Sequence, residues 1–251
     1  MGADTLKSVS KGAVLVLVGM AFGGAVEFFV RTLIGRTLGP AQFGVFSIGY
    51  AIVAVGSSLS LFGLPQGVTR FIPYYGQKKE PQKVRETILL ALKLALAASF
   101  LVAFVLFIFS NWIAWNIFHE KSLGAFLKIF IWALPFFALV ELNSACLRGF
   151  KAVRSKVYSA DLLRGLLLGG AAFSLISLKL KGIAIAYISA PLGATLLGFY
   201  FLARVFPVSV QKSNEEAAKS ESAARSLIGY SWPLAFSTIF SRFQAQIPVF
   251  F

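Results

Sequence analysis

The stretch Arg36-Thr-Leu-Gly-Pro-Ala-Gln-Phe-Gly-Val-Phe-Ser47 decides the fold, and it lies between two long apolar runs, residues 12–35 and 43–64. The pair Gly39-Pro40 can end one helix and begin the next, because glycine tolerates turn dihedrals and proline suits a first helical position. Each run can cross a bilayer, since about 20 apolar residues rising ~1.5 Å each cover ~30 Å. We therefore expect this stretch to be the tip of a transmembrane hairpin.

The composition of the whole chain also indicates a membrane-embedded protein. Of the 251 residues, 57% are hydrophobic and 14% charged, whereas about a quarter of the residues in a soluble domain are charged. A net charge of +14 would point to nucleic acid in a soluble protein. Here the basic residues lie in short segments between apolar runs, where they would meet anionic lipid headgroups. We expect membrane lipids as partners and no nucleic acid.

The apolar runs predict an all-α membrane protein with a six-helix transmembrane bundle followed by a seventh helix. The expected spans are about 12–35, 43–72, 87–110, 123–147, 157–178, 182–204 and 226–251. Pro65 predicts a kink near Leu61, and Pro135 predicts a kink in the fourth span. A loop at 111–122 that carries two tryptophans is expected at headgroup level.

The polar segment 207–225 differs from the rest of the chain and divides it into three parts. Residues 1–206 form the expected N-terminal six-helix lobe, 207–225 a cytoplasmic connector, and 226–251 the first helix of a second lobe. A last span without a partner is typical of half of a two-lobed transporter. We therefore expect the sequence to be a truncated fragment of a longer protein.

The basic residues also predict the orientation. They are most frequent in the N-terminal segment, in 70–85, in 148–156 and in 204–225, which share one side if the spans alternate. The positive-inside rule then places the N-terminus in the cytoplasm of a multi-pass protein of the plasma membrane.

Charged residues within spans are costly and are candidates for a function. Glu27 and Arg31 are four apart on the first span and share a face. They form either a neutralising structural pair or part of a water-filled cavity in which Arg31 meets an anionic substrate. Asp161 and Arg164 are expected to form a local ion pair near the cytoplasmic end of the fifth span.

Four further residues are candidates for lining a cavity. Glu141 and Asn143 lie about 200° apart around a helix of 3.6 residues per turn, so both cannot face one groove. Glu141 shares a face with Arg148, which permits either a structural bridge or a cavity role. Arg70 is either an anchor at the inner surface or a phosphate contact beside a gate. Arg242 makes the outer half of the seventh span polar and is interpreted as lining the cavity.

The sequence shows no motif for catalysis, a metal or a cofactor. The single histidine, His119, has no metal-ligand spacing. No nucleotide-binding glycine motif and no serine, histidine and aspartate set are present. The single cysteine, Cys146, lies in an apolar run and is interpreted as a packing residue. We expect no enzyme, no cofactor and no metal site.

Four segments carry a resemblance to a known family. They are Arg36 to Phe46, Gly63 to Phe71, Leu147-Arg148-Gly149-Phe150 with Tyr158, and Tyr230-Ser231-Trp232-Pro233-Leu234. With these segments in this order, the chain resembles the Wzx-like polysaccharide-biosynthesis flippases. These belong to the multidrug/oligosaccharidyl-lipid/polysaccharide exporter superfamily, and the resemblance covers the first half of a usual member.

The resemblance implies two six-helix bundles around a central cavity that opens alternately to each side. It also implies a substrate, a lipid-diphosphate-linked oligosaccharide or polysaccharide precursor, that moves from the inner to the outer leaflet. Cationic cavity residues often hold the diphosphate in such proteins, and by helix position this role falls to Arg31 and Arg242. Further partners would be glycan-assembly enzymes or a second half-transporter.

Two other functions remain open from the sequence. A cation-coupled multidrug antiporter of the same superfamily would use acidic cavity residues, for which Glu27, Glu141 and Asp161 are the candidates. A non-transporting fragment is the other alternative.

Overall fold

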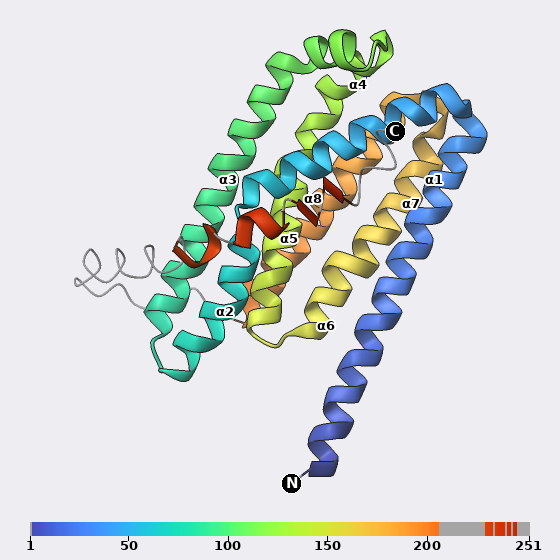
Figure 1. Ribbon diagram of the computed structural model, residues 1–251. Helices are drawn as coiled ribbons and strands as arrows, with labels where there is room; N and C mark the ends of the chain where they lie inside the picture. The colour runs from blue at the N-terminus through green and yellow to red at the C-terminus, as the bar shows by residue number, and fades with distance from the viewer. Residues whose placement is uncertain (1, 206–228, 233, 239, 242, 245–251) are drawn as a thin grey trace.

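The computed structural model describes residues 2–205, 229–232, 234–238, 240–241 and 243–244. Within these ranges the regular elements are helices, and no strand occurs. The main helices (Figure 1) are α1 (Gly2–Leu61), α2 (Leu64–Gln77), α3 (Pro81–Trp112), α4 (Lys121–Phe130), α5 (Leu134–Gly149), α6 (Val153–Lys156), α7 (Arg164–Leu175) and α8 (Lys179–Val205). The predicted all-α fold is confirmed for the described part of the chain.

The hairpin predicted around Gly39 is present. Gly39 has φ 81° and ψ 171°, which lies outside the helical region, and Pro40 follows it. A positive φ of this size is readily adopted only by glycine. The ribbon of α1 reverses its direction at this point (Figure 1), so its two halves run in roughly opposite directions and diverge from the turn.

A second break separates α1 from α2. Phe62 and Gly63 have φ values of 43° and 72° between the end of α1 at Leu61 and the start of α2 at Leu64. The predicted position of the kink is therefore confirmed. Its predicted cause is wrong, because Pro65 lies in the first turn of α2, where a missing backbone N–H removes no helical hydrogen bond.

Four helical stretches are long and apolar enough to cross a membrane, namely Val14–Leu61, Pro81–Ile117, Lys121–Gly149 and Val153–Val205. The first and last contain 48 and 53 residues, which at ~1.5 Å per residue is more than twice the hydrocarbon thickness of a bilayer. The last stretch turns back near Lys179, as the first does at Gly39 (Figure 1). The chain is thus a multi-pass membrane protein, while the count of six spans plus one stays a prediction.

The loop predicted at 111–122 is largely helical. After α3 the chain continues as a π-helical stretch, η1 (Ile113–Ile117), and a short connection leads to α4. Ala114 is fully buried, and its carbonyl accepts a hydrogen bond from the Glu120 backbone N–H at 2.9 Å. The two tryptophans, Trp112 and Trp115, are more than half exposed, as expected for side chains at the headgroup level.

The fourth predicted span bends where the sequence indicated. Between α4 and α5 lies a 3-10 turn, η2 (Ile131–Ala133), and Pro135 occupies the first turn of α5. A tighter helical turn next to proline is a common cause of a kink.

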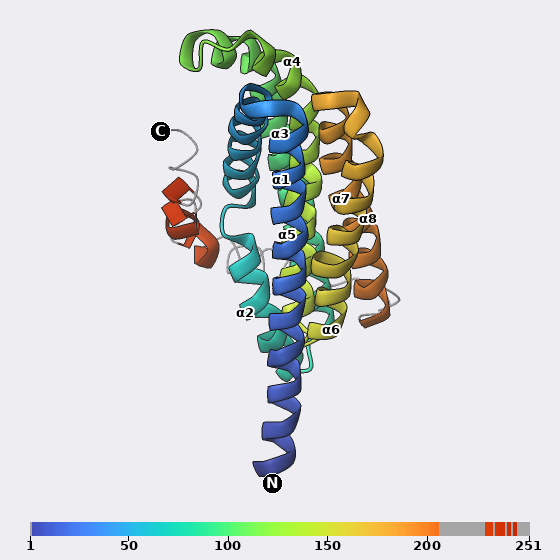
Figure 2. The same cartoon turned by 90° about the vertical axis from the view of Figure 1, so that its right-hand side faces the viewer.

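The helices pack around two apolar clusters. The first cluster surrounds Phe46, which is fully buried and contacts the rings of Phe130 and Tyr187, with centroids 6.3 Å and 5.1 Å away. The second cluster joins α2, α3 and α5 and includes Ile72 and Cys146. Cys146 is fully buried, so its interpretation as a packing residue is confirmed. In the view of Figure 2, α1, α5, α7 and α8 run roughly parallel to one long axis.

Large apolar side chains cover much of the outer surface. They include Phe28 and Phe29 on α1, Phe104 on α3 and Phe173 on α7, all more than 60% exposed. So much exposed apolar surface fits contact with lipid rather than water. The predicted lobe boundaries at 206 and 225 lie outside the described residues.

Candidate functional site

The first charged pair lies on α1, as the sequence predicted. Arg31 donates a hydrogen bond from Nη2 to Oε1 of Glu27 at 2.8 Å. The second carboxylate oxygen of Glu27 lies 3.8 Å from Nη2 of Arg164, at the start of α7. One carboxylate therefore faces two guanidinium groups from two helices, and the group carries a net positive charge.

Two tyrosines form the wall behind these arginines. The guanidinium carbon of Arg31 lies 4.6 Å from the ring centroid of Tyr50, a distance at which a cation is attracted to an aromatic face. The rings of Tyr50 and Tyr187 are 5.8 Å apart. Within the described part of the chain, the buried hydroxyl of Tyr187 and Nε of Arg164 have no hydrogen-bond partner. Both are buried donors beside the charged group, and of the two residues Arg164 also lines the hollow described next.

A small hollow of about 100 Å³ connects this group to α5. Tyr50, Arg164 and Glu141 line it, together with Ser57 and Ser58 of α1. The serines keep it polar although it lies within apolar helices. The hollow thus joins the charged group around Glu27 to the middle of α5.

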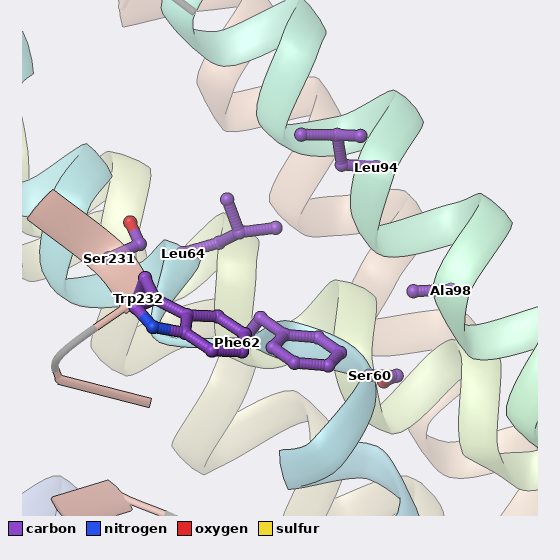
Figure 3. A pocket seen from close by; sticks show the side chains of 7 residues that line it. All are labelled: Ser60, Phe62, Leu64, Leu94, Ala98, Ser231 and Trp232. Carbon is purple, nitrogen blue, oxygen red and sulfur yellow. The ribbon is translucent and has the colours of Figure 1, made fainter. Parts of the chain in front are cut away.

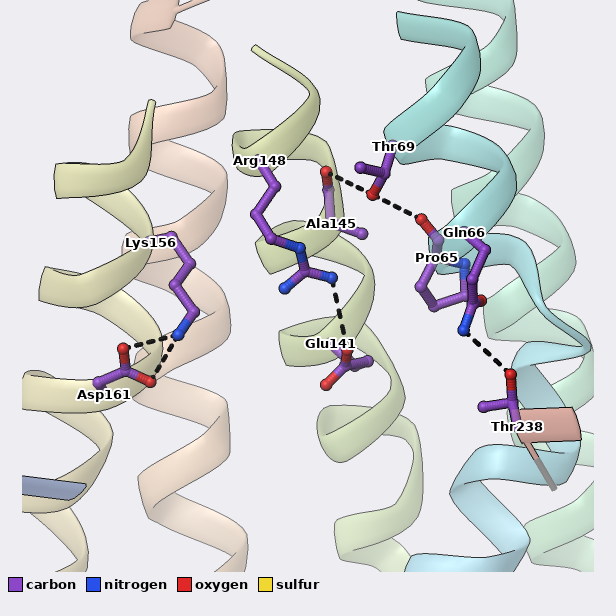
Figure 4. Close-up of polar contacts among 9 residues, drawn as sticks. All are labelled: Pro65, Gln66, Thr69, Glu141, Ala145, Arg148, Lys156, Asp161 and Thr238. Atoms are coloured by element: carbon purple, nitrogen blue, oxygen red, sulfur yellow. Dashed lines mark hydrogen bonds and ion pairs between the residues drawn. The ribbon is translucent and has the colours of Figure 1, made fainter. Parts of the chain in front are cut away.

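A wider groove of about 400 Å³ continues from Glu141 along the first half of α2. Gln66, Thr69 and Arg70 of α2 line one side, and Glu141 and Arg148 of α5 line the other. Arg148 Nη2 lies 3.6 Å from Glu141 Oε1 (Figure 4), which confirms that the two side chains share a face. Both side chains are 40% exposed, so this ion pair is weak and can be separated.

Close packing between α2 and α5 fixes the groove. Thr69 Oγ1 donates to the Pro65 carbonyl at 2.7 Å and lies 3.3 Å from the Ala145 carbonyl of α5 (Figure 4). A Cβ at Gly149 would lie only 3.0 Å from Cβ of Ile72, so the absence of a side chain there allows the helices to approach.

The hollow and the groove share Glu141, and together they form one continuous strip across α1, α7, α5 and α2. We call this strip the polar track. Its charged residues are four arginines and two glutamates, with Tyr50 between them. Its members are Glu27, Arg31, Tyr50, Arg164, Glu141, Arg148 and Arg70. Because phosphate oxygens bind guanidinium groups in bidentate geometry, the strip suits a phosphorylated ligand.

Two predicted site residues lie apart from this arrangement or beyond the described residues. Asn143 is 2% exposed and donates from Nδ2 to the Thr195 carbonyl of α8 at 3.3 Å. It therefore points away from the groove that Glu141 lines, as the angle between them predicted. Arg242 lies outside the described residues.

Arg70 is exposed and lines the groove on its α2 side. Its guanidinium carbon is 4.2 Å from the ring centroid of Tyr230, a residue of the segment that follows the predicted connector. Within the described residues it takes part in no ion pair, so an anionic ligand would meet no competing carboxylate on it.

The predicted ion pair between Asp161 and Arg164 is wrong. Asp161 accepts hydrogen bonds from Nζ of Lys156 at 2.7 Å and 2.9 Å (Figure 4), while Arg164 faces Glu27. Residues 157–163 form a π-helical stretch, η3 (Val157–Leu163). In a π-helix the hydrogen bonds run from i to i+5, which brings residues five apart, such as Lys156 and Asp161, onto one face.

The sequence did not assign Tyr50, Tyr187 or Arg164 to the cavity. Arg164 had a visible signal, a charge within a span, but its partner on α1 is remote in sequence. Tyr50 and Tyr187 had no such signal, because tyrosine is common in apolar cores. Among residues 2–205 and the described parts of 229–244, no group of three His, Cys, Asp or Glu could hold a metal ion.

The comparisons with known proteins give one match. A family model described as "Polysaccharide biosynthesis protein" matches residues 9–251. No curated protein and no solved structure matches the chain.

Proposed function

The chain belongs to the polysaccharide biosynthesis protein family, and from this premise we propose that it moves a lipid-linked oligosaccharide or polysaccharide precursor across the plasma membrane. The substrate carries a diphosphate between lipid and sugar, and it passes from the inner to the outer leaflet by alternating access. Family membership and the apolar helices together support a membrane transporter of the flippase type.

The polar track is the observation that carries this proposal. A diphosphate and its sugars cannot enter hydrocarbon without a large desolvation cost. Four arginines at successive positions along α1, α7, α5 and α2 offer charge-assisted hydrogen bonds along the path that the headgroup would follow. The excess of arginine over glutamate favours an anionic cargo.

Each end of the polar track has a distinct role in this proposal. Arg70 and Arg148 meet the diphosphate at the cytoplasmic side, because the groove they line is wide and their side chains are exposed. Arg31 and Arg164 receive it deeper in the membrane. Glu27 holds these two arginines in place and leaves them with a net charge of one, so that the phosphate is bound and can be released.

The finer architecture belongs to the same proposal. Three arginine side chains of the polar track, Arg31, Arg148 and Arg164, are 28–40% exposed. The track is therefore open along one face of the bundle. A second bundle facing it would complete a cavity, and rocking of the two bundles would alternate the opening. In this arrangement the N-terminus is cytoplasmic, and glycan-assembly enzymes would deliver the substrate from that side.

A cation-coupled antiporter has less support. Such a protein needs carboxylates that are free to take up a cation or a proton. The three acidic candidates instead face basic side chains: Glu27 faces two arginines, Glu141 faces Arg148, and Asp161 faces Lys156.

The proposal is tested with Arg31→Ala in the native gene, so that the variant acts in the assembly that the cell builds. We expect loss of the polymerised glycan at the cell surface and accumulation of the lipid-linked precursor on the cytoplasmic side, with normal insertion into the membrane. Arg36→Ala is the matched control, since Arg36 is an exposed arginine on the same helix at the outer turn. Equal export by both variants would contradict the proposal.

A further inference from the structure

A separate apolar pocket of about 210 Å³ lies on the other side of α2 from the groove of the polar track. Its walls come from three places (Figure 3). Phe62 and Leu64 flank the break between α1 and α2, Leu94 and Ala98 project from α3, and Trp232 closes the third side. We call it the inner pocket.

Segment 229–232 is held tightly against the break. The rings of Phe62 and Trp232 are stacked, with centroids 6.2 Å apart and planes within 9° (Figure 3). A Cβ at Gly63 would clash with the Ser231 carbonyl, so the two backbones touch. Gln66 Nε2 donates to Thr238 Oγ1 at 3.0 Å (Figure 4), and Thr238 lies six residues after Trp232 in the chain.

The pocket lies near the middle of α3, the third predicted span. Leu94 and Ala98 line it, and α3 begins at Pro81 and ends at Trp112, so at ~1.5 Å per residue they lie about 20 Å and 26 Å along that helix. Arg70 lies about 9 Å beyond Leu64 along α2 by the same rise, toward the end of α2 at Gln77. A lipid chain runs from its phosphate toward the middle of the bilayer, which is the direction from Arg70 to the pocket.

The inner pocket and Arg70 share one segment. Arg70 lies over the ring of Tyr230, and the next residue, Ser231, lines the pocket. The Ser231 side chain is buried, and its hydroxyl has no hydrogen-bond partner in the described part of the chain. The apolar pocket, the Ser231 hydroxyl and the Arg70 cation therefore lie in sequence. A membrane lipid has its parts in the same order: the apolar chain, the linkage and the phosphate.

We propose that the inner pocket binds the phosphate-proximal part of the isoprenoid chain of the lipid-linked substrate, while Arg70 contacts its phosphate. This rests on the proposed function. The chain stays in the pocket as the headgroup enters the groove on the other side of α2, since Leu64 and Pro65 are consecutive residues that line the pocket and the groove respectively. Binding begins at the break, and the lipid chain never crosses the polar track.

The test uses the full chain in nanodiscs and a polyprenyl diphosphate that carries a photoreactive diazirine near its phosphate end. We expect the label on the pocket residues of α3 and on segment 229–232. Ala98→Phe fills the pocket and should reduce labelling about tenfold, because each displaced methylene contact is worth about a factor of four. Ala97→Phe is the matched control, since Ala97 is the exposed neighbour on the same helix.

A second variant guards against a folding defect. Trp232→Ala removes the third wall of the pocket but places no larger side chain inside it. It should therefore reduce labelling less than Ala98→Phe does. The melting temperature of each variant is measured alongside. Equal labelling of Ala98→Phe and wild type, or a label on other helices, would overturn the proposal. So would equal labelling by a diazirine phosphatidylglycerol, which would make the pocket a general phospholipid site.

The outcome for transport separates this inference from the proposed function. If the probe labels the pocket of the wild-type protein but that protein exports no precursor in cells, the proposed function is wrong and the pocket remains a lipid-binding site. If Ala98→Phe exports precursor normally in cells and Arg31→Ala does not, the pocket fails and the function stands.

Discussion

The two ends of the polar track hold their arginines in different ways. At the end that the proposal places outward, Glu27 engages Arg31 at 2.8 Å and Arg164 at 3.8 Å, in front of Tyr50 and the buried Tyr187. At the end that the proposal places inward, Arg148 lies 3.6 Å from Glu141 in a wide groove, and Arg70 is exposed beside Tyr230. A rigid, shared carboxylate is typical of a site that must fix one geometry. An open pair of cations is typical of a site of first encounter.

The largest effect is expected from removing both cations at one end. The double variant Arg31→Ala with Arg164→Ala should abolish export, because each charge-assisted contact is worth about 1.5–3 kcal/mol, or roughly 10–100-fold in binding. The double variant Arg70→Ala with Arg148→Ala should slow export but retain a measurable rate, because the outer end still binds. Rates of precursor export in cells check this, and a reversed order would remove the distinction between the ends.

Glu27→Gln should give the next largest effect. It removes the counter-charge of two arginines and keeps the shape of the side chain. The Glu27 carboxylate competes with phosphate for the two arginines, so its loss should tighten the binding of polyprenyl diphosphate about tenfold, or by ~1.4 kcal/mol. Export should be slower, because the bound lipid is released more slowly.

The same variant decides between the two interpretations of this pair. A purely structural role for Glu27 predicts a lower melting temperature with unchanged affinity for the lipid. Glu141→Gln is the control at the inner end, where the looser contact with Arg148 predicts a smaller change in affinity.

The features that the sequence predicted correctly depend on neighbouring residues. The turn at Gly39 follows from the dihedral freedom of one glycine and from the proline after it. The contact of Glu27 with Arg31, and the divergence of Glu141 from Asn143, follow from 3.6 residues per helical turn. These features need no knowledge of how helices pack.

The features that the sequence missed depend on packing or on a local change of helix type. Arg164 reaches Glu27 only because α7 packs beside α1. Asp161 pairs with Lys156 because residues 157–163 are π-helical, and nothing in their composition indicated this. The polar track as a whole joins four helices and could not be read from any one of them.

Gly63→Ala should have a smaller effect than Glu27→Gln, and it should change the structure at the break between α1 and α2. Gly63 has φ 72°, and an added Cβ would clash with the Ser231 backbone. Gly39 has φ 81°, but a Cβ there would meet nothing within 4 Å. Gly63→Ala carries the left-handed backbone cost of about 1–2 kcal/mol. Gly39→Ala carries a cost of about 1–3 kcal/mol, because ψ 171° places Gly39 in a region that is essentially restricted to glycine. Only Gly63→Ala adds displacement of segment 229–232.

Two measurements separate these glycine variants. Both variants should lower the melting temperature, but only Gly63→Ala should shift the fluorescence of Trp232, which loses its stacking on Phe62. Gly170→Ala on α7 is the neutral control, since a Cβ there is in open space and φ is ordinary. Equal changes in Gly63→Ala and Gly39→Ala would show that the inner break does not depend on the segment.

The smallest effect is expected at Asn143. This residue lies two positions after Glu141, which lines both the hollow and the groove, but its side chain is buried against α8. Asn143→Leu removes the hydrogen bond to the Thr195 carbonyl, and it also removes a buried amide oxygen that has no partner among the described residues. These two changes oppose each other, so the free energy of unfolding should change by only about 1 kcal/mol. Export should remain at the wild-type rate, because no atom of Asn143 lines the hollow or the groove. If export falls while the melting temperature holds, the path of the substrate runs between α5 and α8, and the face of α5 that carries Glu141 is not the one that the headgroup follows.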